Sequence, residues 1–191
     1  MIYNFCGDTK GKTSSALGTV MRALGAQKRV RIVFFMKHWN TSETEFLKKM
    51  KESYDIDFYL SGDKEFIYAS DITDATLKEA KEQLKFGNVE KRDDSDIEKA
   101  QRGIKKAEKY LEENPFLLVL DELNYAVSFG LVAIEEARQF LAAAREKGVH
   151  VVITGRDLHK ELAKECDLIT EMKKVKHPFD VGVHAVKGLD Y

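Results

Sequence analysis

The chain has 191 residues, of which 43% are hydrophobic and 33% charged, with two prolines and a formal net charge of −1. This length suits one domain with its own core, so we expect a single domain over residues 1–191. The composition excludes a disordered or fibrous protein. A net charge close to zero argues against a nucleic-acid partner and against binding to a membrane surface.

The chain also lacks the sequence marks of an exported or membrane protein. Cys6 and Cys166 are its two cysteines, and their wide spacing matches neither a disulfide framework nor a metal-binding motif. The chain opens on a strand-like run instead of a signal sequence, and no apolar run approaches the roughly 18–20 residues that cross a bilayer. We therefore expect a cytoplasmic protein.

Short apolar runs rich in β-branched and aromatic residues alternate with helical patterns along the chain. The runs predict strands at 1–6, 30–36, 56–60, 117–120, 149–153 and 167–172. Apolar residues at helical spacing predict helices at 17–24, 97–111 and 134–144. This alternation predicts an α/β fold with a mostly parallel sheet covered by helices on both faces.

Residues 61–95 fit this alternation least well. They show no clear strand pattern, and they contain a predicted helix at 71–86 and the charged stretch NVEKRDDSD. The simplest interpretation of the region is a solvated excursion on the surface of the domain.

The first predicted strand runs into CGDTKGKT, residues 6–13, whose ending is that of a phosphate-binding loop. Such a loop works because successive backbone N–H groups and a helix N-terminus surround the phosphates. Gly7 and Gly11 permit the required backbone, and Lys12 is expected to face solvent and reach phosphate oxygens. Lys10 adds a second cation, or else is simply a solvated residue at the loop tip.

A cysteine stands where the general motif G-x-x-x-x-G-K-[ST] has its first glycine. The thiol of Cys6, close to a helix N-terminus, would have a lowered pKa and react readily with alkylating agents. Alternatively, Cys6 is a small buried side chain that ends a strand.

A pair of acids follows a buried strand in LLVLDELNYA, residues 117–126. In P-loop proteins, a carboxylate at the end of such a strand holds the metal opposite the loop threonine or serine. Thr13, Asp121 and Glu122 are therefore the predicted ligands of Mg²⁺ or Mn²⁺. The alternative is that the two acids merely cap the next helix.

A further candidate is Arg156 in VVITGR, which follows the strand predicted at 149–153. Open α/β sheets bind ligands at the carboxyl ends of their strands. Arg156 is thus placed to reach the phosphates.

These segments together resemble the P-loop type of ATP:corrinoid adenosyltransferase. The resemblance rests on GDTKGKT, where the family has GxGKGKT, and on FFMKHWNTSETEFL, LDELNYA, VITGR and the tail CDLITEMKKVKHPFDVGVHAVKGLDY. The segments follow the family's order over nearly the whole chain, with 61–95 poorly matched. The resemblance implies a P-loop NTPase-like (RecA-like) fold.

The resemblance also implies a reaction, in which Co(I) of a reduced corrinoid attacks the 5′ carbon of ATP and triphosphate leaves. Co(I) is a strong nucleophile without a proton, so no activating base is needed. Lys10, Lys12 and Arg156 would then be catalytic by stabilising the leaving group. The implied nucleotide-binding residues are Gly7, Asp8, Thr9, Lys10, Gly11, Lys12, Thr13 and Ser14. A homodimer and a reductase or flavodoxin-like electron donor are the implied partners.

The chain departs from the family pattern at three places. Thr9 replaces the second glycine of the loop, and the chain begins at its first strand without the family's N-terminal covering segment. The GFTW-like turn that lies under the corrinoid has no intact copy. We expect residues 62–88 to form a mobile flap in its place, with Phe66 and Tyr68 against the corrinoid, or alternatively Phe86.

Two other functions remain open from the residues alone. One is a P-loop kinase or NTPase that cleaves between phosphates and uses Glu122 to position the attacking group. The other is a non-catalytic relative that binds nucleotide or corrinoid. The phosphate product distinguishes them: triphosphate, diphosphate with orthophosphate, or none.

Overall fold

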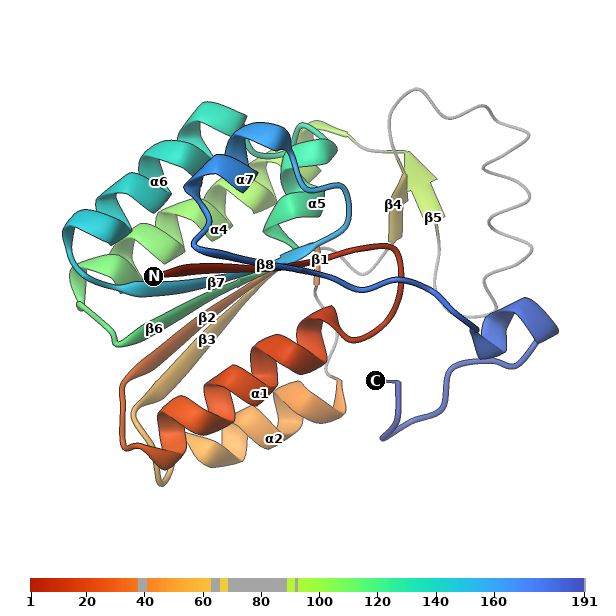
Figure 1. The fold of residues 1–191 in the computed structure, drawn as a ribbon, viewed down its shortest axis with the longest axis horizontal. Helices are drawn as coiled ribbons and strands as arrows, with labels where there is room; N and C mark the ends of the chain where they lie inside the picture. The colour runs from red at the N-terminus through yellow and green to blue at the C-terminus, as the bar shows by residue number, and fades with distance from the viewer. Residues whose placement is uncertain (38–40, 63–65, 69–88, 92, 191) are drawn as a thin grey trace.

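The protein is built around a parallel six-stranded sheet in the order β3-β2-β6-β7-β1-β8 (Figure 1). This computed structural model describes residues 1–37, 41–62, 66–68, 89–91 and 93–190. The strands are β1 (Ile2–Cys6), β2 (Val30–Phe35), β3 (Ile56–Ser61), β6 (Leu117–Asp121), β7 (His150–Gly155) and β8 (Leu168–Glu171). All six predicted strands are confirmed, as is the parallel α/β sheet of a P-loop NTPase-like (RecA-like) fold.

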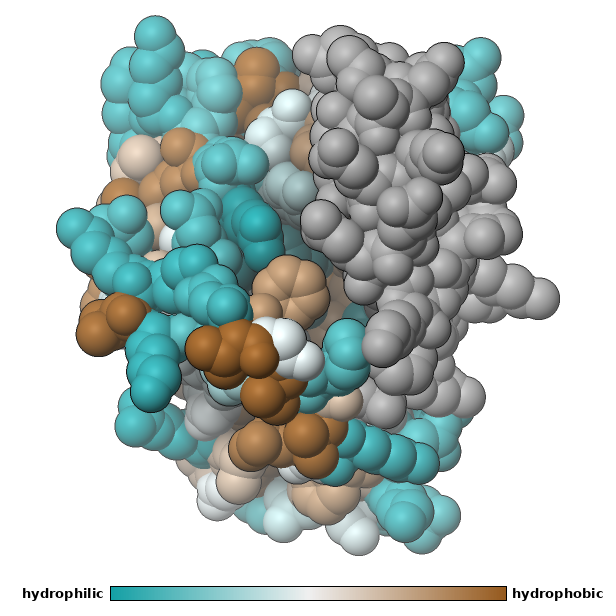
Figure 2. Space-filling model, turned by 90° about the vertical axis from the view of Figure 1, so that its right-hand side faces the viewer, coloured by the Kyte–Doolittle hydropathy of each residue, from teal (hydrophilic) through white to brown (hydrophobic). Residues whose placement is uncertain are grey.

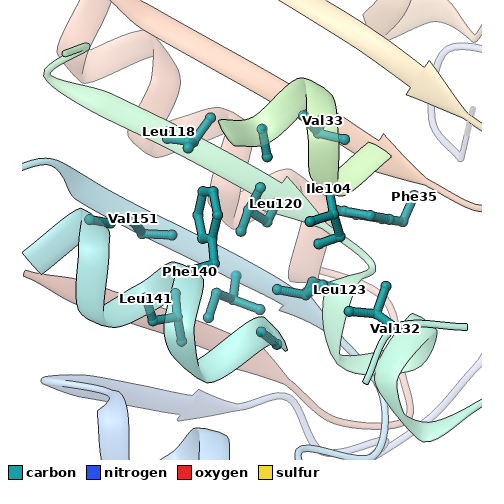
Figure 3. Packing of buried hydrophobic residues seen from close by; sticks show 14 of the residues in the cluster. Val33, Phe35, Ile104, Leu118, Leu120, Leu123, Val132, Phe140, Leu141 and Val151 are labelled. Atoms are coloured by element: carbon teal, nitrogen blue, oxygen red, sulfur yellow. The ribbon is translucent and has the colours of Figure 1, made fainter. Parts of the chain in front are cut away.

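Helices cover both faces of this sheet, as the sequence predicts (Figure 1). One face carries α1 (Lys12–Gly25) and α2 (Ser42–Met50), and the other carries α4 (Asp94–Glu112), α5 (Leu123–Ser128), α6 (Ile134–Glu146) and α7 (Lys160–Glu165). Each face buries its own apolar cluster. Figure 3 shows the cluster on the face covered by α4, α5, α6 and α7, where the ring of Phe140 in α6 points toward Leu118 and Leu120 of β6.

The strand order decides which loops meet. β7 lies between β1 and β6, with Cys6 beside Gly155 and Phe34 of β2 beside Asp121. Because all strands run parallel, the segments that follow β1, β2, β6 and β7 leave the sheet at one edge. The phosphate-binding loop, the acid pair and Arg156 are therefore brought to the same edge.

The prediction for residues 61–95 was wrong in one respect, because this region contains strands. β4 (Phe66–Tyr68) and β5 (Val89–Lys91) form a separate parallel pair. Each has three residues, too few for an alternating pattern to be recognised in the sequence. The helix predicted at 71–86, with Phe86, lies outside the described residues.

The chain continues beyond β8 as an extended segment with a single short 3₁₀ helix, η1 (Pro178–Val181). In Figure 1 this segment leaves the sheet edge and turns back toward α1. Among the helices that the structure describes, none has both the length and the apolar character of a membrane span.

Candidate nucleotide and metal site

The loop between β1 and α1 has the backbone that a phosphate-binding loop requires. Gly7 and Gly11 have φ angles of 113° and 114°, a region that favours glycine. A Cβ atom added at Gly7 would also lie 2.2 Å from the carbonyl oxygen of Met172, so no other residue fits there. Thr9 is not among the described residues with positive φ, so the loop accommodates threonine at this position without backbone strain.

Lys12 is buried, with 7% of its surface exposed, and its ammonium donates a hydrogen bond to the carbonyl oxygen of Thr9 at 2.7 Å. The expectation that Lys12 faces solvent was therefore wrong. The cause is local: the loop curls so that one of its own carbonyl groups accepts from the ammonium. Burial lowers the pKa of Lys12, while Glu122 and Asp121 oppose the shift.

Asp121 lies at the end of β6 with 3% of its surface exposed. One carboxylate oxygen accepts a hydrogen bond from the Thr154 hydroxyl at 2.6 Å, and the other accepts from the Thr13 hydroxyl at 3.3 Å. Burial raises the pKa of Asp121 despite these two hydrogen bonds. The predicted meeting of the loop threonine with the acid after β6 is thus present in the structure.

Glu122 has a left-handed backbone, with φ 61° and ψ 20°, which is unfavourable for a residue with a side chain. Its backbone N–H donates to the Thr154 hydroxyl at 2.9 Å, which helps to hold this conformation. Its side chain makes no cap hydrogen bond to α5, so the helix-capping alternative is wrong. Burial, and then the neighbouring Asp121, raise the pKa of Glu122 to about 7, while Lys12 and Arg156 oppose the shift.

These groups fit a magnesium ion by their chemistry. Mg²⁺ prefers oxygen ligands and is usually bound by one or two carboxylates together with substrate phosphates. Two adjacent acids and the Thr13 hydroxyl supply such a partial set beside the phosphate-binding loop. In the described part of the chain there is no cluster of three or more His, Cys, Asp or Glu side chains that could hold a metal.

Lys37 is not among the site residues predicted above, but it lies near the acid pair. It follows β2, and its ammonium lies 2.5 Å from a Glu43 carboxylate oxygen and 4.8 Å from the ring centroid of Phe34. Its charge opposes the raised pKa of both Asp121 and Glu122, so it lies within electrostatic reach of the acid pair. The available signal was a lysine shortly after a buried strand, at the edge where ligands bind.

Asn4 and Asn124 form a second feature that sequence reasoning missed. Both are fully buried, and each side-chain amide donates to the other's oxygen, at 3.0 and 2.9 Å. Asn124 also donates to the carbonyl oxygen of Gly155 at 3.3 Å. The pair joins β1, α5 and β7, the three elements next to the loop, the acid pair and Arg156. The signal was a polar residue inside the apolar run MIYNFC.

The two remaining predicted cations lie at the same edge. Arg156 follows β7 directly and is exposed, and its charge contributes to lowering the pKa of Lys12. Lys10 is half exposed, and its ammonium pairs with the carboxylate of Asp190. Lys10 is therefore not simply a solvated loop tip. Asp8 and Ser14 lie in the loop and the first turn of α1.

The structure favours the unreactive alternative for Cys6. This residue is 7% exposed, and burial raises the pKa of its thiol, with Glu171 adding to the shift. Phe66 and Tyr68 have the extended backbone expected from their spacing, because both belong to β4. Their side chains lie outside the described part of the structure, as does the whole of Trp39.

The fold and the loop together define a P-loop nucleotide-binding protein, and comparison with known proteins specifies the family. The model of the family "ATP:corrinoid adenosyltransferase BtuR/CobO/CobP" matches residues 1–191. The chain therefore belongs to this family, and it is an ATP:corrinoid adenosyltransferase. This membership leaves the kinase and the non-catalytic alternatives without support.

Curated relatives agree over the full length. The chain is similar to the corrinoid adenosyltransferase of Escherichia coli strain K12, with 31% identity over 193 residues that cover 100% of this chain and 85% of the relative. Corrinoid adenosyltransferase CobA of Salmonella typhimurium strain LT2 is 33% identical, with coverage of 100% and 85%. The corrinoid adenosyltransferase of Pseudomonas aeruginosa is 32% identical, with coverage of 97% and 80%.

Proposed function

We propose that the chain transfers the 5′-deoxyadenosyl group of ATP to Co(I) of a corrinoid at the edge of the sheet described above. The observation that carries this placement is the convergence of three features of a nucleotide site. These are the glycine-dependent loop, the buried Lys12, and the contact between Thr13 and Asp121. Family membership supports the reaction itself.

In the proposed reaction, an electron pair of Co(I) forms the cobalt–carbon bond to C5′ of the ribose. The bond between C5′ and its oxygen breaks, and triphosphate leaves with that electron pair. No proton moves in this step, so the protein needs no general base. Its task is to orient ATP and to stabilise the charge of the leaving group.

Lys12, Lys10 and Arg156 are the proposed catalytic cations. The Lys12 ammonium donates to the Thr9 carbonyl oxygen at 2.7 Å, and a phosphate oxygen would replace this acceptor. The backbone N–H groups of residues 7–14 would bind the phosphate chain where α1 begins. These contacts hold ATP by its leaving group and leave C5′ free for attack.

We further assign Thr13, Asp121 and Glu122 to Mg²⁺ or Mn²⁺. The ion would neutralise part of the triphosphate charge when bound. The electrostatics of the two acids support this assignment, because burial and Asp121 raise the pKa of Glu122 to about 7, and a divalent cation would favour the ionised forms of both carboxyls.

Phe66 and Tyr68 are the proposed corrinoid contacts. Large apolar side chains can exclude the lower cobalt ligand without offering a new one, which would ease reduction of Co(II). The extended backbone of β4 supports this proposal, since residues i and i+2 of a strand lie on one face.

The chain is proposed to act as one domain over residues 1–191, because a single sheet joins strands from both halves of the sequence. The working form is proposed to be a cytoplasmic homodimer that receives electrons from a reductase or a flavodoxin-like donor. The exposed edge strand β8 is compatible with a second copy.

The decisive experiment is anaerobic incubation with ATP, Mg²⁺ and chemically reduced corrinoid. We expect the absorption spectrum of a cobalt–carbon bond and one triphosphate released per bond formed. Release of diphosphate and orthophosphate, with no change in the corrinoid spectrum, would contradict the proposal.

A further inference from the structure

Residues 172–190, here called the strap, contact the phosphate-binding loop at both of their ends. At the first end, the Met172 N–H donates to the carbonyl oxygen of Cys6 at 2.8 Å, and the Met172 backbone packs against Gly7. At the other end, the Asp190 carboxylate forms an ion pair with the ammonium of Lys10. The strap thus leaves the loop beside β8 and returns to it, as the course of the chain in Figure 1 shows.

The far end of the strap is held mainly by polar contacts. Inside the strap, Lys174 pairs with Asp180 at 3.0 Å, and a second oxygen of Asp190 accepts from the Val186 N–H at 2.6 Å. Its exposed apolar side chains are Val175, Phe179, Val181, Val183, Val186 and Leu189. Figure 2 shows apolar side chains gathered on the face of the molecule where the strap lies. A segment that buries so little apolar surface opens at a low free-energy cost.

Asp190 forms an ion pair with Lys10, which is one of the positively charged residues of the proposed nucleotide site. The Asp190 side chain is 18% exposed and that of Lys10 is 48% exposed. The hydrogen bond from Lys10 lowers the pKa of Asp190, so the carboxyl is ionised at neutral pH. Lys10 is therefore paired with a negative charge from the strap, and a bound phosphate would have to compete with it.

We propose that Asp190 is a positioning residue that competes with the phosphates of ATP for Lys10, so that ATP binding releases the far end of the strap. Triphosphate carries several negative charges, which attract Lys10 and repel Asp190 when they come close. Because the coupling is reciprocal, an anchored strap weakens phosphate binding by the same factor by which phosphate weakens anchoring. This inference relies on the proposed role of the loop in binding ATP.

The first test is calorimetric titration with inorganic triphosphate in the absence of corrinoid. A partly exposed ion pair is worth little, so we expect Asp190→Asn to bind triphosphate about two- to fivefold more tightly than the parent chain. The matched control is Asp180→Asn, which removes a carboxylate of the same strap that pairs with Lys174 and not with the loop. The control should keep the parental affinity, and Asp190→Glu should restore it. An unchanged or weakened affinity in Asp190→Asn overturns the inference.

The second test is hydrogen exchange of peptides from the strap. In the parent chain, exchange at 183–190 should accelerate with ATP or triphosphate but not with adenosine, which lacks phosphates. In Asp190→Asn, exchange should already be fast without ligand. Equal exchange with triphosphate and adenosine would overturn the inference. The adenosyl-transfer assay distinguishes this inference from the proposed function. If the chain transfers no adenosyl group but the triphosphate affinities and exchange rates are as expected, only the proposed function is refuted.

Discussion

Replacing Glu122 by glutamine should stabilise the ligand-free chain while removing its response to Mg²⁺. The side chain is partly buried beside Asp121, and burial and this neighbouring acid raise its pKa from 4.5 to about 7. At pH 8 the folded chain must therefore keep a charge in a place that disfavours it. Glutamine has the same shape without the charge, so the variant escapes this cost.

The pKa shift sets the size and the pH range of the effect. One pKa unit corresponds to about 1.4 kcal/mol, and contact of the side chain with solvent reduces the cost, so we expect a gain of about 1–2 kcal/mol at pH 8. Because the folded pKa of Glu122 lies above the unfolded value, the cost of ionisation grows as pH rises from about 4.5 to 7 and is constant above that. The gain should therefore shrink at pH 5 and vanish at lower pH.

Urea denaturation of both chains at pH 8 and pH 5 measures this gain. The control is Glu146→Gln, an exposed residue at the end of α6, which should change the free energy of unfolding by less than about 0.5 kcal/mol. Titration with ATP should show that Mg²⁺ strengthens binding to the parent chain but not to Glu122→Gln. No gain at pH 8, or an equal gain at both pH values, would refute the view that Glu122 is held as an unfavourable carboxylate awaiting a cation.

Three further variants test other parts of the site. Lys12→Met keeps the buried stem and should weaken triphosphate binding by at least about tenfold, measured by calorimetry; an unchanged affinity would remove Lys12 from the phosphate site. Asn124→Leu leaves Asn4 buried without its partner and should lower the free energy of unfolding, measured by urea denaturation, by about 2–3 kcal/mol. Adding Asn4→Leu should recover part of this loss, and strictly additive losses in the double variant would contradict the coupling of the two residues. Phe66→Ala should slow adenosylation that starts from Co(II) but not from pre-reduced Co(I), and equal rates from Co(II) would shift the assignment to Phe86.

Local sequence patterns determined the sheet, the main helices and the loop. The runs that form the central strands β2, β6 and β7 are almost continuously apolar, because these strands are buried on both faces of the sheet. The ending GKT after a strand predicts the phosphate-binding loop, since glycine and lysine at this spacing serve a specific backbone shape. The sequence does not predict β4 and β5, because three residues are too few to show an alternation of apolar and polar side chains.

Only the tertiary structure decided how the predicted site residues are held. The burial of Lys12, the pairing of Lys10 with Asp190, and the buried pair Asn4 and Asn124 depend on contacts that local patterns do not contain. Lys10 and Asp190 are 180 positions apart, and the asparagines 120. Such contacts arise because β7 enters the sheet between β1 and β6 and because the chain after β8 returns to the loop. The spacing of residues along the chain does not show which distant segments become neighbours. The effects of these contacts on charge and burial therefore appear only in the folded molecule.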